Sequence, residues 1–116
     1  MDSLTAKKCQ SCEGMEKPLT KEQALAYLKN TSGWQIDTQE KSIDREYVMK
    51  NFMAAIQFIQ KIAEIAESEN HHPDIHLTGY RKLRIHLSTH AIGGLSENDF
   101  IVAAKINELP VELKKI

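Results

Sequence analysis

Hydrophobic and polar residues alternate along the chain with two different periods, which predict helices and strands in a definite order. The clearest segment runs from about residue 52 to 69, where apolar residues recur at three- and four-residue steps, as in an amphipathic helix. This stripe consists of Phe52, Ala55, Ile56, Ile59, Ile62, Ala63 and Ala66. Asn51 precedes it as a capping residue. Phe58 and Ile65 fall outside the stripe and widen the apolar face, which favours packing against a partner subunit over simple deep burial.

A period of two marks a strand further along the chain, over residues 82–90. Its apolar face consists of Leu83, Ile85 and Leu87, and its polar face of Lys82, Arg84, His86, Ser88 and His90. Gly93 and Gly94 end this strand. The segment 74–80 before it is predicted to be a loop or a short edge strand, because Pro73 ends any helix that precedes it.

Shorter segments complete the order. They are a helix over about 20–30, a hairpin over 34–50 and a last helix from Ser96 to about 107. Thr20 and Gln23 form the capping box of the first helix, and Pro110 stops the last one. The resulting order, α-β-β-α-β-β-α, predicts an α+β two-layer fold with a four-stranded antiparallel sheet and helices on one face.

Composition and charge narrow the class of protein. The 116 residues suffice for one domain, and hydrophobic residues at 41% with charged residues at 27% are ordinary globular values. We divide the chain into a flexible arm over residues 1–18 and a single domain over 19–116. The net charge of −1 disfavours nucleic-acid binding through phosphates. With no apolar run near the ~20 residues of a membrane span and no secretory signal, the expected location is the cytoplasm.

Two cysteines, Cys9 and Cys12, form a lone CxxC motif in the arm. A zinc site usually needs four ligands, so the motif supplies at most half of one. A redox motif is expected between a strand and a helix, and the local pattern shows neither. Two reduced thiols in a mobile arm are the preferred interpretation, with a disulfide or a metal shared between subunits as alternatives.

The candidate chemistry lies in histidines that follow the long helix and the patterned strand. His71 and His72 precede Pro73 where the helix must end, and His90 ends the strand. Histidine both donates and accepts protons near neutrality, because its unperturbed pKa is about 6.5. These histidines therefore indicate acid–base catalysis on a small neutral molecule. Glu67, one helical turn before His71, is expected to hydrogen-bond that imidazole.

Each candidate also has a plainer interpretation. His90 alone would be a solvated surface residue, and Glu67 a surface carboxylate at a helix end. Asp99 fits as the acidic partner in the cap of the last helix, and Trp34 fits as a core residue. A metal site from Glu67, His71 and His90 is a minor alternative, since the HExxH motif is absent and ligand spacing does not favour it. We expect no metal.

An ordered set of residues resembles one family. The set comprises Glu67, His71-His72-Pro73, Tyr80, Leu87-Ser88-Thr89-His90, Gly94-Leu95-Ser96 and Asp99, with Gly33-Trp34 and Asn51-Phe52 before it. From Leu19 to its end the chain resembles the pterin-4a-carbinolamine dehydratases, and its CxxC arm resembles the bacterial branch. The resemblance implies a dehydratase that converts 4a-hydroxytetrahydropterin to quinonoid dihydropterin, recycling the cofactor of aromatic amino acid hydroxylases. It implies no cofactor and no metal in the dehydratase itself.

The resemblance also implies roles for the candidate residues. Carried over by position, His71 and His90 would transfer protons, while His72 would line the pocket and contribute. Glu67 and Asp99 would orient these groups rather than act as the primary acids. The reaction needs a proton donor for the hydroxide that leaves C4a and a base that removes a proton from a ring nitrogen. Histidines that titrate near neutral pH suit both steps, each of which typically gains 10²–10⁴-fold from acid–base catalysis.

Binding contacts and an assembly follow from the same resemblance. The main chain around Ser88 and Thr89 would hold the pterin ring, and Trp34 would lie nearby. The sheet and the long helix would associate into a homodimer or homotetramer through edge strands and that helix. One departure is the segment between Pro73 and Tyr80, which is slightly longer than the family's usual spacing. This departure bears on the shape of that loop and on the preference for the substrate's side chain.

Two other classes of function stay open. One is a non-catalytic binding module, an oligomer that holds a partner protein through its long helix, as animal relatives also act as partners of a transcription factor. The other is a small zinc protein. The enzyme is the preferred interpretation, because the histidine set and the bacterial character of the arm favour it.

Overall fold

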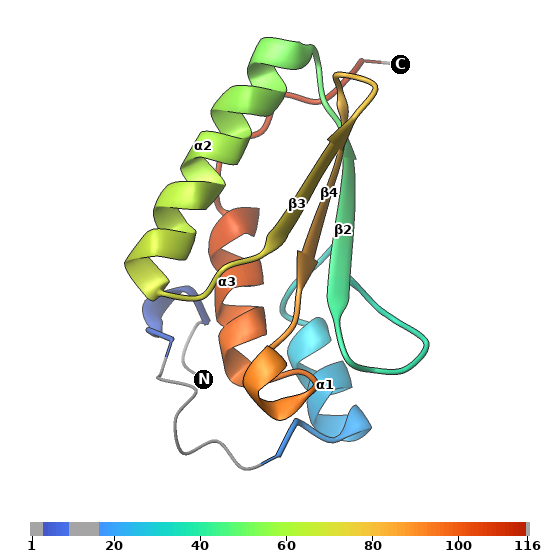
Figure 1. The fold of residues 1–116 in the computed structure, drawn as a ribbon, viewed down its shortest axis with the longest axis vertical. Coiled ribbons are helices and arrows are strands. Elements are labelled where there is room, and N and C mark those ends of the chain that lie inside the picture. The colour runs from blue at the N-terminus through green and yellow to red at the C-terminus, as the bar shows by residue number, and fades with distance from the viewer. Residues whose placement is uncertain (1–3, 10–16, 116) are drawn as a thin grey trace.

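The computed structural model describes residues 4–9 and 17–115, which form two layers (Figure 1). The helices are α1 (Lys21–Leu28), α2 (Phe52–Glu69) and α3 (Glu97–Asn107), with two short 3-10 helices, η1 (Leu4–Ala6) and η2 (His90–Ile92). The strands are β1 (Gln35–Ile36), β2 (Ile43–Val48), β3 (Asp74–Thr78) and β4 (Lys82–Leu87). They form one antiparallel sheet in the order β1-β2-β4-β3. The predicted α+β fold and its order of elements are confirmed.

The helices cover one face of the sheet and leave the other face open (Figure 1). Alternation along β4 creates this division, because Leu83, Ile85 and Leu87 are buried while the residues between them are more exposed. The segment predicted as a loop or edge strand is the edge strand β3. Gly79 and Tyr80, both with positive φ, turn the chain from β3 into β4. This hairpin tip lies at the opposite end of the sheet from the end of α2 (Figure 1).

Both ends of α2 follow from the residues placed there. Asn51 caps the first turn, as predicted. At the other end Asn70 adopts the left-handed conformation with φ 51°, which asparagine tolerates better than most residues. The Asn70 amide donates to the Glu67 carbonyl at 3.3 Å, and the next amide, that of His71, reaches back to the Ala66 carbonyl at 3.2 Å. These two bonds form a Schellman motif, which ends the helix and turns the chain at His71.

The buried face of α2 differs from the stripe that periodicity predicts. Its buried residues are Ala54, Ala55, Phe58, Ile62, Ala66 and Glu69. Phe58, outside the predicted stripe, is buried and packs edge-on against Tyr47 with ring centroids 5.1 Å apart. Phe52 and Ile56, inside the predicted stripe, are 49% and 38% exposed. The prediction is confirmed for Ala55, Ile62 and Ala66 and wrong for Phe52 and Ile56. An apolar arc wider than one face allows several rotations of the helix, and packing against the sheet and α3 selects one.

Segments from both ends of the chain complete the packing. η1 lies against α3, where Leu4 is buried. Near the carboxyl end, Leu113 forms an isolated bridge with Met49, just beyond the end of β2. Part of the arm that was predicted to be flexible is therefore packed on the domain, while the domain boundary itself stays a prediction. Cys12 lies outside the described residues.

Two isoleucines on α2 provide a test of its rotation. Ile62→Ala is expected to lower the free energy of unfolding by about 2–5 kcal/mol, because Ile62 is 0% exposed and its truncation leaves a cavity. Ile56→Ala removes the same atoms at a 38% exposed position and is expected to cost less than about 1 kcal/mol. Denaturant unfolding of the two variants measures both values. Equal losses would contradict the rotation described here.

Candidate active site

The end of α2, the end of β4 and the start of α3 lie at the same end of the sheet (Figure 1). A buried carboxylate lies at this junction. This carboxylate belongs to Asp99, which is 0% exposed. Its Oδ1 lies 2.6 Å from Nε2 of His71, itself buried. Its Oδ2 accepts hydrogen bonds from the Thr89 hydroxyl at 2.9 Å and from the Ser96 amide at 3.0 Å. Asp99 thus joins α3 to the loop after β4 and to the residue that leaves α2.

The contact with Asp99 determines which nitrogen of His71 carries a proton. An ionised carboxylate only accepts hydrogen bonds, so Nε2 of His71 must donate. A neutral imidazole with its proton on Nε2 has its lone pair on Nδ1. Within residues 4–9 and 17–115, Nδ1 has no hydrogen-bond partner. The pair therefore offers a nitrogen that accepts a proton, backed by a carboxylate that stabilises the imidazolium formed.

Asp99 holds this position because it also caps α3. The Ser96 amide donates to Oδ2, which is one half of the capping box predicted from the sequence. The other oxygen, Oδ1, remains for His71. The same side chain therefore caps α3 and contacts His71.

The loop that carries Thr89 is closed by its own backbone. The Thr89 amide donates to the Gly94 carbonyl at 2.8 Å, and the Gly94 amide returns a bond at 3.3 Å. The Thr89 hydroxyl donates to Asp99 and so accepts the bond from the Ser96 hydroxyl, 2.8 Å away. A Cβ at Gly94 would lie 2.8 Å from Cβ of Pro18, so a larger residue would force the loop away from the start of α1.

The predicted pairing of Glu67 with His71 is corrected by the structure. Oε2 of Glu67 lies 2.5 Å from Nε2 of His72, and both side chains are exposed. The spacing of one helical turn would place residue 71 above Glu67 only if the helix continued. Because Asn70 is left-handed, the chain turns instead, and His71 points inward to Asp99.

His90 also lies in a different element from the one predicted. β4 ends at Leu87, and His90 begins η2 with an exposed side chain. The bridge between Thr89 and Gly94 encloses the turn that begins at His90, so the alternation of the strand does not reach that residue. His90 nevertheless follows directly after Thr89, which places it at the same end of the sheet as Asp99.

Ser88 lies between the end of β4 and the bridge at Thr89. β3 and β4 pair Asp74 with His86, so the same register extended by two residues would set His72 opposite Ser88. β3 begins only at Asp74, and no ladder is formed at that position. Ser88 and His72 therefore both lie just beyond the last β3–β4 pair, at the same end of the sheet.

Trp34 is not brought to this site. Its side chain is buried, and its indole Nε1 donates to Oδ1 of Asn107 at 2.9 Å. Asn107 is the last residue of α3, whereas Asp99 lies in its first turn, about 12 Å away along the helix axis. The same Asn107 oxygen accepts from Arg45 at 2.5 Å, so Trp34 belongs to the core at the far end of α3.

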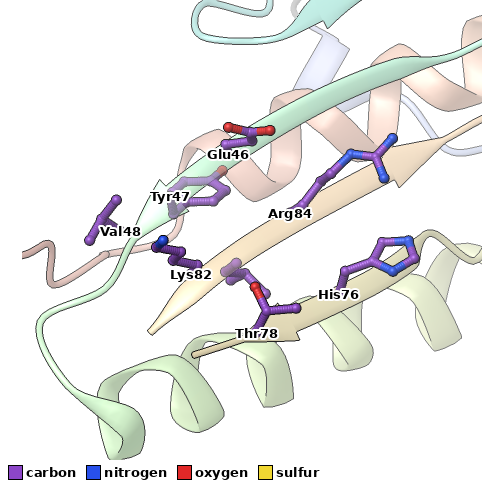
Figure 2. Close-up of a pocket in the computed structure, with 8 residues that line it drawn as sticks. Glu46, Tyr47, Val48, His76, Thr78, Lys82 and Arg84 are labelled. Carbon is purple, nitrogen blue, oxygen red and sulfur yellow. The ribbon is translucent and has the colours of Figure 1, made fainter. Parts of the chain in front are cut away.

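The open face of the sheet carries a groove of about 530 Å³ (Figure 2). It is lined by Glu46, Tyr47, Val48, His76, Thr78, Lys82, Leu83 and Arg84. None of the predicted site residues lines it. On the same face, His86 Nδ1 lies 2.8 Å from Asp44, so this histidine is also apart from the site around Asp99. The chemistry indicated by His71 therefore lies away from this groove.

Sequence reasoning missed a second buried carboxylate, that of Glu69 in the last turn of α2. It accepts hydrogen bonds from Lys105 Nζ at 2.6 Å and from the Cys9 amide at 2.8 Å. Burial raises the pKa of Glu69, but the hydrogen bonds from Lys105 and Cys9 and the charge of Lys105 outweigh it and hold the pKa below its usual value. A glutamate at a helix end is normally exposed, so no sequence signal indicates this cluster.

Other kinds of site are not found in the part of the chain that the structure describes. There, no three His, Cys, Asp or Glu side chains are grouped so that they could hold a metal ion. No helix among these residues is long and apolar enough to cross a membrane.

The fold and the His71–Asp99 pair define a small α+β protein with a site suited to proton transfer. A family model described as pterin 4 alpha carbinolamine dehydratase matches residues 17–109. The chain belongs to this family, whose activity is that of a hydro-lyase. The matched residues include His71, His72, His90 and Asp99.

Relatives agree with this assignment. A mitochondrial protein of Arabidopsis thaliana, named pterin-4-alpha-carbinolamine dehydratase 2, is 46% identical over 94% of this chain, which spans 60% of that protein. A Methylococcus capsulatus protein named for the same activity is 44% identical over 95% of this chain and 96% of its own length.

Solved structures are similar as well. One, described as a transcriptional coactivator/pterin dehydratase from Brucella melitensis, is 31% identical with a TM-score of 0.73 and covers 78% of this chain and 96% of its own. A pterin dehydratase-like protein, described as a RuBisCO assembly factor in the alpha-carboxysome, shares the fold at a TM-score of 0.54 and 17% identity. It covers 65% of this chain and 86% of its own.

Asp99→Asn is expected to move the ring proton of His71 from Nε2 to Nδ1. The two donors at Oδ2, from Thr89 and Ser96, require an oxygen there, so the amide nitrogen must face His71. Nε2 then becomes an acceptor and the proton moves to Nδ1. Nitrogen-15 shifts of the His71 ring report this exchange, and unfolding should show a loss of about 1–3 kcal/mol. An unchanged tautomer would contradict the assignment of the hydrogen bond.

Proposed function

We propose that the chain dehydrates 4a-hydroxytetrahydropterin by histidine acid–base catalysis, with His71 as the base and His90 as the acid. The observation that carries this proposal is the buried His71–Asp99 pair, whose Nε2–Asp99 bond leaves Nδ1 to accept a proton. It is supported by family membership over residues 17–109. Asp99 is the orienting group, and it stabilises the charge that His71 gains.

The reaction balances with these two groups. The C4a–O bond breaks, and the departing hydroxide takes a proton from His90 to become water. A ring nitrogen of the pterin gives its proton to Nδ1 of His71, which forms the quinonoid dihydropterin. Solvent then returns the proton from His71 to His90. His90 suits the acid role because it is exposed to solvent and none of the described residues hydrogen-bonds its ring. The reaction requires no metal and no covalent nucleophile.

The remaining candidates would hold the substrate. The main chain of Ser88, which lies beyond the last β3–β4 pair, would pair with the edge of the pterin ring. Both main-chain groups of Thr89 already pair with Gly94, so Thr89 contributes through its side chain and Asp99 instead. His72, which contacts Glu67 at the surface, would also contact the substrate.

The physiological setting follows from the activity. We infer that the chain recycles the tetrahydropterin of an aromatic amino acid hydroxylase in the cytoplasm, with no cofactor of its own. The substrate is a small ring system that is uncharged at its reacting centre.

Single histidine variants test this proposal. His71→Ala and His90→Ala are each expected to slow the decay of enzymatically generated 4a-hydroxytetrahydropterin by about 10²–10⁴-fold, because each removes one proton-transfer group. His76→Ala, on the exposed edge strand, serves as the matched control and should keep the wild-type rate. Absorbance in the ultraviolet follows the decay. Wild-type rates in both site variants would overturn the proposal.

A second candidate function rests on the outer face of α2. Phe52, Met53 and Ile56 are exposed there, although they are large and apolar. Apolar faces of this kind mark interaction surfaces. The Brucella melitensis structure is described as a coactivator as well as a dehydratase. We therefore propose that this face joins copies of the chain into a homodimer or homotetramer, and that a partner protein would use the same face.

Charging that face tests the assembly separately from catalysis. Ile56→Glu is expected to shift the protein from a dimer or tetramer to a monomer, because a charge would be buried in the interface. Gln57→Glu, the next residue and also exposed, adds the same charge beside the apolar face and should leave the assembly intact. Sedimentation equilibrium measures the mass. A wild-type monomer, or an Ile56→Glu variant that remains associated, would count against this interface.

A further inference from the structure

The family model begins at residue 17, yet residues 4–9 of the arm are packed beside the site. η1 lies against α3, close to the end of α2 (Figure 1). Lys7 Nζ bonds to Glu97 Oε2 at 2.9 Å, and the Tyr27 hydroxyl donates to the same oxygen at 2.7 Å. The arm is therefore anchored at the first turn of α3, the turn that contains Asp99.

The arm's contact nearest to the site is made by main chain. The Cys9 amide donates to Oε1 of Glu69 at 2.8 Å, and Lys105 Nζ donates to Oε2 at 2.6 Å. Glu69 is buried and lies two residues before His71. One carboxylate thus ties the arm, the last turn of α2 and the last turn of α3 together.

The Cys9 side chain plays a lesser part in this contact. Burial, followed by the negative charge of Glu69, raises the pKa of the Cys9 thiol to about 12, so the group stays protonated at neutral pH. The thiol makes only a 3.6 Å contact with the Asn98 carbonyl. The amide, which any residue except proline supplies, is the group that Glu69 needs.

We propose that Glu69 is a positioning residue for His71, and that the arm holds it through the Cys9 amide. The proposal rests on the proposed function, because it treats His71 as the base. Two polar links join the end of α2 to α3: Glu69 to Lys105 before the left-handed turn, and His71 to Asp99 after it. The first link fixes the turn from which His71 leaves the helix, and so limits how the imidazole meets Asp99.

The two links differ in what they control. The His71–Asp99 bond sets the separation of one nitrogen and one oxygen, and it permits the ring to rotate about that contact. Helix ends fray unless they are tied down. Glu69 holds the last turn of α2 by a buried ion pair and by the arm, so the backbone of Asn70 and His71 starts from one position. The direction in which Nδ1 faces the substrate depends on the position of this backbone.

The test separates the amide of residue 9 from its side chain. Cys9→Pro removes the amide hydrogen, whereas Cys9→Ala keeps it and removes the thiol, so the alanine variant is the matched control. Glu69→Gln keeps the shape and removes the charge that pairs with Lys105. Each variant is measured in the full chain for kcat, KM, melting temperature and the low-field proton of the His71–Asp99 hydrogen bond.

Cys9→Pro and Glu69→Gln are expected to lower kcat about fivefold, or about 1 kcal/mol in the barrier, with KM nearly unchanged. The low-field proton of His71 should shift or broaden in both variants and stay in place in Cys9→Ala. Glu69→Asp, which keeps the charge on a shorter stem, should recover part of kcat. If Cys9→Pro fails to fold, Glu69→Gln still decides the question.

Two results would overturn the proposal: an unchanged low-field proton in Glu69→Gln, or a loss of melting temperature in that variant with wild-type kcat at lower temperature. Failure of the proposed function has a different signature. In that case His71→Ala keeps full activity, while the proton signal still reports whether Glu69 controls the His71–Asp99 contact.

Discussion

The Asp99 carboxylate is the interaction on which the rest of this structure depends. Burying a carboxylate is costly unless hydrogen bonds replace its hydration. Here the replacements come from the His71 ring, the Thr89 hydroxyl and the Ser96 amide, and each belongs to a different part of the chain. The charge is compensated only when the end of α2, the loop after β4 and the start of α3 are assembled. Folding and construction of the site are therefore one event at this end of the sheet.

This dependence explains why the site lies where the regular elements stop. Within α2 or β4 the backbone groups are used by helix and ladder bonds, and side-chain directions are set by their periods. Beyond the last turn of α2, the left-handed Asn70 turns His71 inward and leaves His72 at the surface. Beyond β4, the bridge between Thr89 and Gly94 turns Thr89 toward Asp99. The two adjacent histidines therefore have different partners: His71 contacts the buried carboxylate of Asp99, and His72 contacts the exposed carboxylate of Glu67.

The sequence was informative wherever a local rule determines the structure. The caps at Asn51 and Ser96 predicted where α2 and α3 begin, and the alternation along β4 predicted the buried face of the sheet. The rotation of α2 was not predictable, because its apolar arc is wider than the surface it covers and only tertiary packing chooses Phe58 over Ile56.

At the site too, local sequence rules predict some features and not others. The identities of the histidines and of Asp99 were visible as a motif, but their partners were not. Glu67 would lie next to residue 71 only if the helix continued. Because Asn70 is left-handed, Glu67 contacts His72 instead. The main chain of Thr89 is expected to hold the substrate, but in the structure it pairs with Gly94. The Thr89 side chain instead donates a hydrogen bond to Asp99. Partners set by a turn or a tertiary contact lie beyond what periodicity can predict.

In the proposed mechanism, the two buried carboxylates have complementary effects on His71. Asp99 acts on the charge of His71 directly, through one hydrogen bond. Glu69 does not touch the imidazole, and its own charge is compensated by Lys105, so it adds little to the field at the ring. Its contribution is mechanical, because it holds the helix turn that carries His71. In the proposed mechanism, a group that transfers a proton needs both a suitable charge beside it and a fixed direction. Asp99 in the first turn of α3 would supply the charge, and Glu69 in the last turn of α2 would supply the direction.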